Sequence, residues 1–533
     1  MTKNPKFIIF GIDGADFFLT QRLMDKGLLP NLKFLKDLGT YSKLESTNPP
    51  LTPQAWSSFV SGVNPGKHGV FDFGELQWGS YEPRLNTSDD RKTKGFWEYL
   101  QQEGYTSSAI NMPLTWPPEN LNEGYMVSGM HTPDVASLTK HQGIKEFIDK
   151  DFFHYKIDVM SHWYKSMDLF LENVYEMIHI RSDLAISLQE RFPVDVMFVT
   201  FTGLDRVCHA LWGQQDFVNP QNDWKYSQEV TKVFQLIDEK VGLILEKFSP
   251  KDGVMVLSDH GFGSLSHDVY LNSYFLELGH LKLDATKLYN TITNHPNWGR
   301  GWPLKVLFKL LSHIRFVQRK IDFRHKSFQD IHWKKSKAFS MGLFGNVYMH
   351  CSDRFPQGLF ARGSEQYHLA RQSVVADLRA LKHRGKKVVD ELYFSEHIYK
   401  GPYQIKAPDL ILKMRNYDYI TRGGSEFGSP FIFDTPELHH SGNHRSEGVF
   451  FLSGNNVSKK KTSKRAQLQD LTPTLFSLMD VAIPKDMDGK VLHELLIENN
   501  PYYDEINIYR NLDSSSVIES EEVKSRLKAL GYI

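Results

Sequence analysis

Short apolar runs that end at glycine, proline or aspartate recur along this chain, and they constrain the fold more than any other feature. They lie at 6–14, 107–113, 194–203, 253–261, 407–414 and 447–454. Their apolar residues are nearly continuous, which is typical of strands buried on both faces of a mainly parallel sheet. Helical patterns lie between them, at 165–191 and 224–248. We therefore expect an α/β fold with helices on both faces of a central sheet.

The composition narrows the class of protein. Lysine plus arginine and aspartate plus glutamate both number 63, so the overall charge gives no sign of nucleic-acid binding. Only two cysteines occur, Cys208 and Cys351, which favours a reducing compartment over a secreted disulfide scaffold. The first apolar run is too short for a signal peptide, and no run approaches the ~18 residues of a membrane span. We expect a soluble, cytoplasmic protein.

Two stretches interrupt the core pattern and divide the chain. We expect a discontinuous core at 1–114, 191–270 and 390–495, a helical insert at 115–190, a basic, aromatic-rich cap insert at 271–389 and a tail at 496–533. Within the cap insert, 303–321 has apolar residues at helical spacing with basic residues between them. This pattern fits a solvated cap helix, and alternatively a helix that lies on an anionic lipid surface.

Polar residues gather at the ends of the expected strands. Asp13, Asp205, Asp259 and His260 all lie at or just after the end of an apolar run. Each one alone is well explained as a turn or cap residue. In open α/β sheets, however, ligands bind at the carboxyl ends of the strands, so several such residues together indicate a site.

The spacing of these residues suits metal ions. Asp205 and His209 are four residues apart, which places both on one face of a helix, and Asp259 and His260 are adjacent on a turn. Three more imidazoles precede the last apolar run, at His439, His440 and His444. Two groups of oxygen and nitrogen ligands would hold two divalent ions about 4 Å apart, an arrangement used for in-line displacement at phosphorus.

Five segments, taken in order, resemble the alkaline phosphatase superfamily, and within it the type I phosphodiesterase / nucleotide pyrophosphatase branch. They are FGIDG, PPLTPQAWSSFVSGVNPGKHGVFDF, GLDRVCHALW, SDHGFG and GNHRSEGVFFLSG, and the similarity extends through 470–492. The resemblance implies an alkaline-phosphatase-like fold with inserted cap regions. It also implies two divalent metal ions, usually Zn²⁺ with Mn²⁺ as the alternative, at the carboxyl edge of the sheet.

The resemblance carries over to metal ligands position by position. One ion would take Asp13, Thr52, Asp259 and His260, and the other would take Asp205, His209 and His444. His444 is preferred to the two histidines before it, because GNHRSEG matches the context of the ligand in the family. Both sets consist of nitrogen and oxygen ligands, as zinc sites do.

Thr52 has two interpretations. A threonine followed by proline is typical of a helix N-cap, with Pro53 at the first helical position. The resemblance implies that Thr52 is also the nucleophile, which a bound cation activates, and that a phospho-threonine intermediate is then hydrolysed. It further implies an asparagine three residues after the nucleophile that holds a phosphate oxygen; Ala55 stands at that position, and the adjacent Gln54 is the candidate for this substrate contact.

The expected activity is hydrolysis of phosphoesters, with phosphodiesters preferred because of the nearest branch. The alternatives are a phosphomonoesterase, a phosphotransferase similar to the phosphoglycerate mutases, and a non-enzymatic scaffold that binds a lipid or partner through the basic insert. A sulfatase is disfavoured, because position 52 is neither cysteine nor serine and Trp56 stands where an arginine would be needed. The substrate and the oligomeric state stay open.

Overall fold

The computed structural model describes residues 4–215, 217, 225–284, 328–422, 431–436, 440–459, 461–464, 466–497 and 501–510. The amphipathic segment expected at 303–321 and the end of the expected tail, 511–533, lie outside these ranges. The possible lipid contact through 303–321 therefore stays a prediction.

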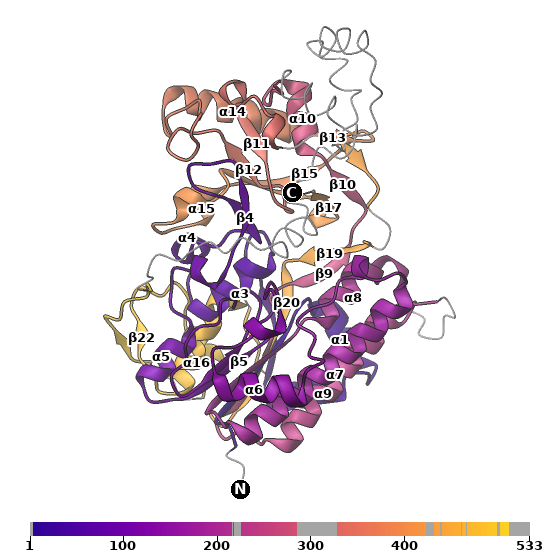
Figure 1. Cartoon of the computed structure of the whole chain (residues 1–533), viewed down its shortest axis with the longest axis vertical. Helices are drawn as coiled ribbons and strands as arrows, with labels where there is room; N and C mark the ends of the chain where they lie inside the picture. Colours follow the sequence, from indigo (N-terminus) through magenta and orange to yellow (C-terminus); the bar gives the residue numbers. More distant parts are fainter. Residues whose placement is uncertain are drawn as a thin grey trace.

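An eight-stranded sheet forms the centre of the lower lobe in Figure 1. Its order across the sheet is β21 (Ala466–Gln467), β2 (Thr40–Glu45), β20 (Glu447–Gly454), β8 (Gly253–Leu257), β1 (Phe7–Ile12), β7 (Val196–Phe201), β5 (Ser107–Ile110) and β6 (Tyr125–Val127). Strand β20 is antiparallel to both of its neighbours, and the other strand pairs are parallel. The expected mainly parallel sheet is confirmed.

Both faces of the sheet are buried under helices. On β1, Ile8, Phe10 and Ile12 pack into one apolar cluster, while Phe7 and Ile9 pack into another on the opposite face. The first cluster lies under α1 (Phe17–Asp25), α2 (Pro30–Leu38), α6 (Gln142–Asp151), α7 (Met167–Arg191), α8 (Gly203–Leu211) and α9 (Glu229–Lys247). The second lies under α3 (Thr52–Ser61), α5 (Phe96–Gln102) and α16 (Leu471–Leu478). Burial on both faces explains why the strand sequences are continuously apolar.

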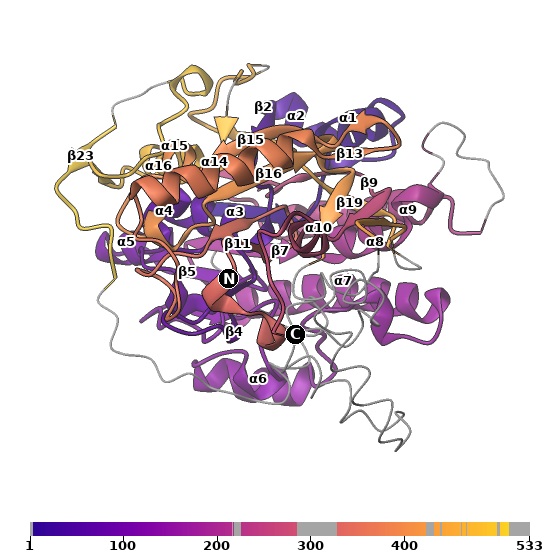
Figure 2. The ribbon, with the colours of Figure 1, turned by 90° about the horizontal axis from the view of Figure 1, so that it is seen from above.

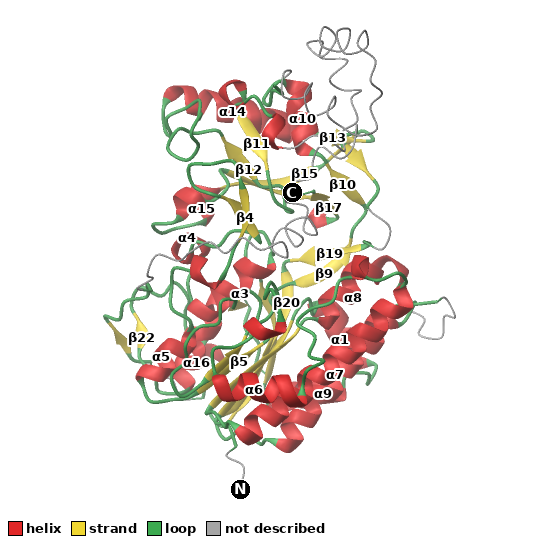
Figure 3. Cartoon of the chain, viewed as in Figure 1, coloured by secondary structure: helices red, strands yellow, loops and turns green. Residues whose placement is uncertain are grey.

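A second lobe stands over the carboxyl ends of the parallel strands (Figures 1 and 3). Its four-stranded antiparallel sheet has the order β11 (Ala338–Ser340), β12 (Val347–Met349), β16 (Leu410–Met414) and β15 (Val389–Phe394). Helices α10 (Leu271–Leu278) and α14 (Glu365–Ala380) pack with it around a separate apolar cluster. Seen from above, α14 lies over the central part of the molecule (Figure 2). We call this lobe the cap.

Smaller sheets and strand pairs complete the fold. A three-stranded sheet contains β17 (Tyr419–Thr421), β10 (His267–Val269) and β18 (Phe433–Asp434), and a two-stranded ribbon contains β9 (Gly261–Ser264) and β19 (Gly442–Arg445). Further two-stranded pairs are β3 (Gly74–Leu76) with β4 (Pro83–Leu85), β13 (Lys382–His383) with β14 (Lys386–Lys387), and β22 (Ile483–Pro484) with β23 (Tyr503–Asp504). Two short helices are α4 (Pro65–His68) and α15 (Ser395–Ile398).

Two segments occupy different places from those expected. The run at 407–414 was expected among the strands of the central sheet, but it forms β16 in the antiparallel sheet of the cap. A short apolar run shows that a strand is buried without showing which sheet buries it, and this explains the error. The range 115–190, expected as a helical insert, contributes β6 to the central sheet in addition to α6 and α7.

None of the helices in the described ranges combines the length and apolar character that crossing a membrane requires. The two cysteines are both buried and unpaired.

His68, at the end of α4, is a buried structural histidine with a strongly lowered pKa. Its Nδ1 accepts a hydrogen bond from the Val70 N–H (3.2 Å), so Nε2 carries the proton and lies 3.0 Å from Ser58 Oγ. Burial, and secondly the charge of Arg91, lower the pKa of His68 to about 3. A second proton would have to sit on Nδ1, against the Val70 N–H.

We therefore expect acid to destabilise the protein through this residue. The unfolded chain binds a proton at His68 near pH 6.5 and the folded chain does not, so its contribution to stability is complete above pH 6.5 and is lost as the pH falls toward 3. The slope from this group is about 1.4 kcal/mol per pH unit. Denaturant unfolding between pH 7 and pH 5 measures it. His68→Gln should show a shallower slope, and an equal slope in both proteins would contradict the assignment.

Candidate metal and phosphoryl-transfer site

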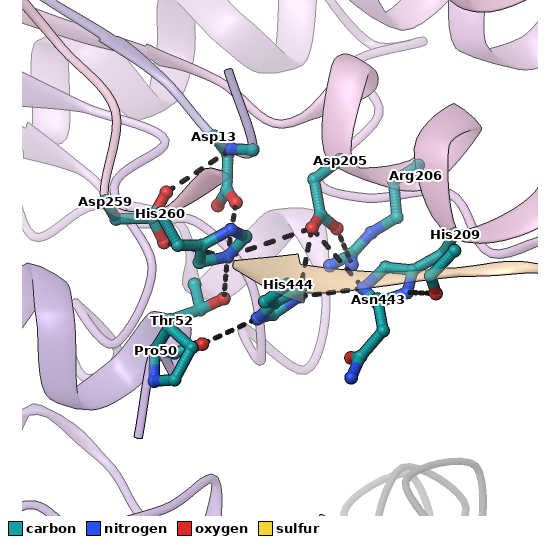
Figure 4. A network of polar contacts seen from close by, with 12 residues as sticks. Asp13, Pro50, Thr52, Asp205, Arg206, His209, Asp259, His260, Asn443 and His444 are labelled. Atoms are coloured by element: carbon teal, nitrogen blue, oxygen red, sulfur yellow. Dashed lines mark hydrogen bonds and ion pairs between the residues drawn. The ribbon is translucent and has the colours of Figure 1, made fainter. Parts of the chain in front are cut away.

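The predicted site residues meet at the carboxyl edge of the central sheet (Figure 4). Asp13 follows β1, Asp205 lies in the first turn of α8 after β7, and Asp259 and His260 follow β8. These three strands are adjacent and parallel, so their ends lie side by side. Thr52 begins α3, His209 lies one turn after Asp205 on α8, and His444 lies on β19.

Two glycines allow the chain segments around the site to approach one another. Gly14, after Asp13, has φ +77°, and a Cβ there would lie 3.1 Å from the Asp205 Cα. At Gly442, a Cβ would lie only 2.2 Å from the Cys208 carbonyl oxygen. This close contact of β19 with α8 brings His444 beside His209.

The first predicted ligand set gathers around the His260 imidazole. His260 Nε2 lies 3.5 Å from Asp13 Oδ1, 3.3 Å from Asp259 Oδ2 and 3.2 Å from Thr52 Oγ1. The three carboxylate and imidazole ligand atoms of Asp13, Asp259 and His260 lie within 4.8 Å of one another. The structure thus brings together all four residues of this set, as Figure 4 shows.

The second predicted set is equally compact. Asp205 Oδ1 lies 3.4 Å from both His209 Nε2 and His444 Nε2, and the two nitrogens are 2.9 Å apart. Tetrahedral zinc ligands at about 2.0–2.1 Å from the ion are about 3.3 Å from each other. His260 Nε2 is 4.0 Å from Asp205 Oδ1, so this imidazole lies between the two sets.

The backbone sets the tautomer of every histidine in the cluster. His209 Nδ1 lies 3.0 Å from the Gly442 carbonyl, His260 Nδ1 3.1 Å from the Gly261 carbonyl, and His444 Nδ1 2.8 Å from the Pro50 carbonyl. A carbonyl only accepts hydrogen bonds, so Nδ1 carries the proton in each case and Nε2 presents a lone pair. Such second contacts are typical of metal-ligating histidines.

Because Nε2 of each histidine carries a lone pair and no proton, the histidines supply no positive charge to the cluster. The Nε2 atoms of His209 and His444 face each other without a proton between them. Within the described part of the chain, Asp13 Oδ1, Asp205 Oδ1 and Asp259 Oδ2 are buried and accept no hydrogen bond. Buried anionic oxygens without donors are costly unless a cation is present. These carboxylate oxygens and imidazole nitrogens are therefore suited to bind divalent cations.

The pKa values of the cluster residues reflect the same crowding of buried carboxylates. Burial, followed by the neighbouring charge of Asp205, raises the pKa of Asp13 well above its ordinary value, and burial with Asp13 and Asp205 does the same for Asp259. Burial also acts to raise the pKa of Asp205, but its neighbours on α8 and β19 outweigh burial and hold that pKa well below the ordinary value. Burial lowers the pKa of His260 well below 6.5, which keeps the imidazole neutral.

Thr52 does not cap its helix. The N-cap of α3 is Leu51, which has an extended backbone, and Thr52 is the first helical residue with Pro53 after it. The Thr52 hydroxyl lies 3.2 Å from His260 Nε2, where it donates a hydrogen bond because Nε2 is unprotonated. The expectation of a cap with Pro53 at the first helical position was wrong by one residue, and the hydroxyl faces the cluster instead. Asp16, by contrast, caps α1 by accepting a hydrogen bond from the Leu19 N–H.

Three further residues lie close to the cluster. The Gln54 amide nitrogen lies 3.4 Å from the Asn48 carbonyl and 3.1 Å from the Tyr399 hydroxyl. The role of Gln54 as a phosphate contact stays a prediction. It requires the Gln54 amide to give up its contacts with Asn48 and Tyr399. Arg445 donates to backbone carbonyls, including those of His444 and Ser264. His440 lies beside His209, with ring centroids 5.4 Å apart.

Two hydrogen bonds to predicted metal ligands could not be inferred from the sequence motifs. Trp56 Nε1 donates to Asp13 Oδ2 (3.4 Å), one helical turn after Thr52. Arg206 Nη1 donates to Asp205 Oδ2 (2.7 Å). Trp56 and Arg206 are both in quoted segments, but a sequence alone does not show which residues beside a ligand turn toward it.

The mainly parallel sheet and the cluster at its carboxyl edge agree with the alkaline-phosphatase-like fold that the resemblance implied. The sequence matches the type I phosphodiesterase / nucleotide pyrophosphatase family over residues 7–421, and the chain belongs to this family. Family and fold together support a phosphoester hydrolase.

Solved structures with the same fold include phosphonoacetate hydrolase from Sinorhizobium meliloti 1021. Its complex with phosphonoformate is 13% identical with a TM-score of 0.56, and its complex with phosphonoacetate is 14% identical with a TM-score of 0.55. Both comparisons cover 88% of this chain and 94% of the solved chain. A search of curated protein sequences found no match.

Proposed function

We propose that this protein is a two-metal-dependent phosphoester hydrolase, with phosphodiesters as its preferred substrates and Thr52 as its nucleophile. The observation that carries the proposal is the position of the Thr52 hydroxyl, which is not used as a helix cap and lies 3.2 Å from His260 Nε2. That imidazole is the point at which the two ligand sets meet. The metal ligands are those predicted, with Asp13, Thr52, Asp259 and His260 in one set and Asp205, His209 and His444 in the other.

The chain's own residues have separate tasks in this reaction. Thr52 loses its hydroxyl proton to solvent as Oγ1 attacks phosphorus, the bond from phosphorus to the leaving-group oxygen breaks and that oxygen takes up a proton, and water then cleaves the phospho-threonine and restores the hydroxyl. Two divalent ions, which we propose to be Zn²⁺, would activate the hydroxyl and the water when bound and would offset charge on the phosphoryl oxygens. The N-terminus of α3, which begins at Thr52, favours an anionic group at the same place.

A panel of chromogenic substrates tests this activity. We expect metal-dependent hydrolysis of bis-p-nitrophenyl phosphate, slower hydrolysis of p-nitrophenyl phosphate, and none of p-nitrophenyl sulfate. Rates should vanish in a chelator and return with Zn²⁺ or Mn²⁺. Faster cleavage of the monoester would reverse the preference. If the protein released phosphate from phosphonoacetate and cleaved none of the esters, its activity would match that of the structurally similar hydrolase. If it turned over none of these compounds, the scaffold alternative would be supported.

We also propose that the protein works in the cytoplasm on a small phosphoester. Both cysteines, Cys208 and Cys351, are buried thiols, which suits a reducing compartment. Cell fractionation with an antibody against the chain checks this proposal, and recovery outside the cytoplasm would contradict it.

A further inference from the structure

Asp205 uses its two carboxylate oxygens differently. Oδ2 accepts a hydrogen bond from Arg206 Nη1 at 2.7 Å. Oδ1 accepts no hydrogen bond from the described residues and faces the Nε2 atoms of His209 and His444 at 3.4 Å. Arg206 therefore determines which oxygen of Asp205 points to the predicted metal position, and it occupies the other.

The guanidinium of Arg206 is in turn held by Asp158. Arg206 Nε donates to Asp158 Oδ1 and Nη2 donates to Asp158 Oδ2, both at 2.8 Å. The side chains are only 8% and 11% exposed. Bidentate pairs of this kind have defined geometry, and low exposure strengthens them. Nε and Nη2 of Arg206 bind Asp158, and Nη1 binds Asp205. The guanidinium is therefore directed at the predicted metal ligand Asp205 and not at a substrate.

The segment that carries Asp158 is itself anchored to the central sheet. Arg181 of α7 is fully buried and donates to the carbonyls of Lys156 and Ile157, each at 3.1 Å. It also donates to Thr202 Oγ1, directly after β7. Tyr155 donates to Asn111 Oδ1, directly after β5 (3.2 Å). Asp158 is thus positioned from the same sheet edge that positions Asp205.

The charge balance gives the pair a second role. Arg206 alone would place a positive charge beside the expected metal position and oppose the binding of a cation. Asp158 cancels that charge, so the carboxylate is oriented without a net electrostatic cost. We infer that Arg206 and Asp158 are a positioning pair that sets the metal affinity of the Asp205, His209 and His444 site. This inference rests on the proposed metal-dependent function.

Zinc affinity, measured by competition with a chromogenic chelator, tests the inference without relying on activity. Asp158→Asn leaves Arg206 uncompensated and should weaken one of the two zinc equivalents by about 10–100-fold, the usual effect of losing an outer contact. Arg206→Lys cannot form the bidentate contact with Asp158, so it should weaken binding of the same zinc equivalent. The double variant Arg206→Gln with Asp158→Asn restores the net charge, so it should bind zinc more tightly than Asp158→Asn alone.

A matched control separates metal positioning from general stability. Arg84 and Asp90 form another bidentate pair, at 2.8 and 2.7 Å, outside the metal cluster. Asp90→Asn should lower Tm without changing zinc affinity. The inference is overturned if Asp158→Asn and Arg206→Lys alter zinc affinity no more than Asp90→Asn, or if the double variant binds no better than Asp158→Asn. A wild-type chain that binds neither Zn²⁺ nor Mn²⁺ would instead overturn the proposed function, and this inference with it.

Discussion

Replacing Thr52 with alanine lowers the rate of phosphodiester hydrolysis by at least about 10³-fold, because the only proposed nucleophile is lost. Thr52 is 2% exposed and its hydroxyl contacts His260. The second ligand set, which does not include Thr52, should still bind its zinc equivalent. Steady-state rates on bis-p-nitrophenyl phosphate, together with the metal content of the purified variant, measure both effects.

Two variants serve as controls for the Thr52 result. Thr52→Ser keeps a hydroxyl on the same helix position and should retain measurable turnover. Ser61→Ala removes a hydroxyl from the other end of α3, where it donates to the Ser57 carbonyl, and should leave the rate within a few-fold of wild type. Full activity in Thr52→Ala would remove Thr52 from the mechanism.

Asp205→Asn should abolish high-affinity binding of one metal equivalent and lower the rate by at least about 10³-fold. Asp205 supplies the only carboxylate of the second predicted set, and its Oδ1 faces both imidazoles at 3.4 Å. An amide keeps the shape but removes the negative charge, so the loss reports on metal binding more than on packing. Elemental analysis and titration with Zn²⁺ measure the change.

Asp409 offers a matched control for Asp205. It is also a buried carboxylate with an arginine partner, Arg362 at 2.8 Å, but it lies in the cap. Asp409→Asn should cost stability while both metal equivalents stay bound. If Asp205→Asn binds two ions as tightly as Asp409→Asn does, the assignment of the second set is wrong.

The strand ends were the most predictable part of the site. Asp13, Asp205 and Asp259 each follow an apolar run, and parallel neighbours place their carboxyl ends at one edge of a sheet. Sequence pattern therefore predicted that these three carboxylates come together, whereas Thr52 and His444 were expected from the family resemblance. It did not predict which sheet the run at 407–414 joins, because burial on both faces looks the same in either sheet.

Other features needed the three-dimensional structure. Thr52 was expected as an N-cap from a local rule, but the extended residue before it takes that place and the hydroxyl faces His260. Arg206 and Asp158 are 48 residues apart, and a charged pair at that separation leaves no periodic pattern. The carbonyls of Pro50, Gly261 and Gly442 set the histidine tautomers through backbone atoms, which side-chain motifs do not reveal.

The central claim is that two metal ions and Thr52 form one reaction centre. Anomalous diffraction at the zinc edge, from crystals of the zinc-loaded wild-type protein, tests it most directly. The account predicts two peaks, one among Asp13, Thr52, Asp259 and His260 and one among Asp205, His209 and His444. A single peak, or two peaks of which neither contacts Thr52 Oγ1, would contradict it.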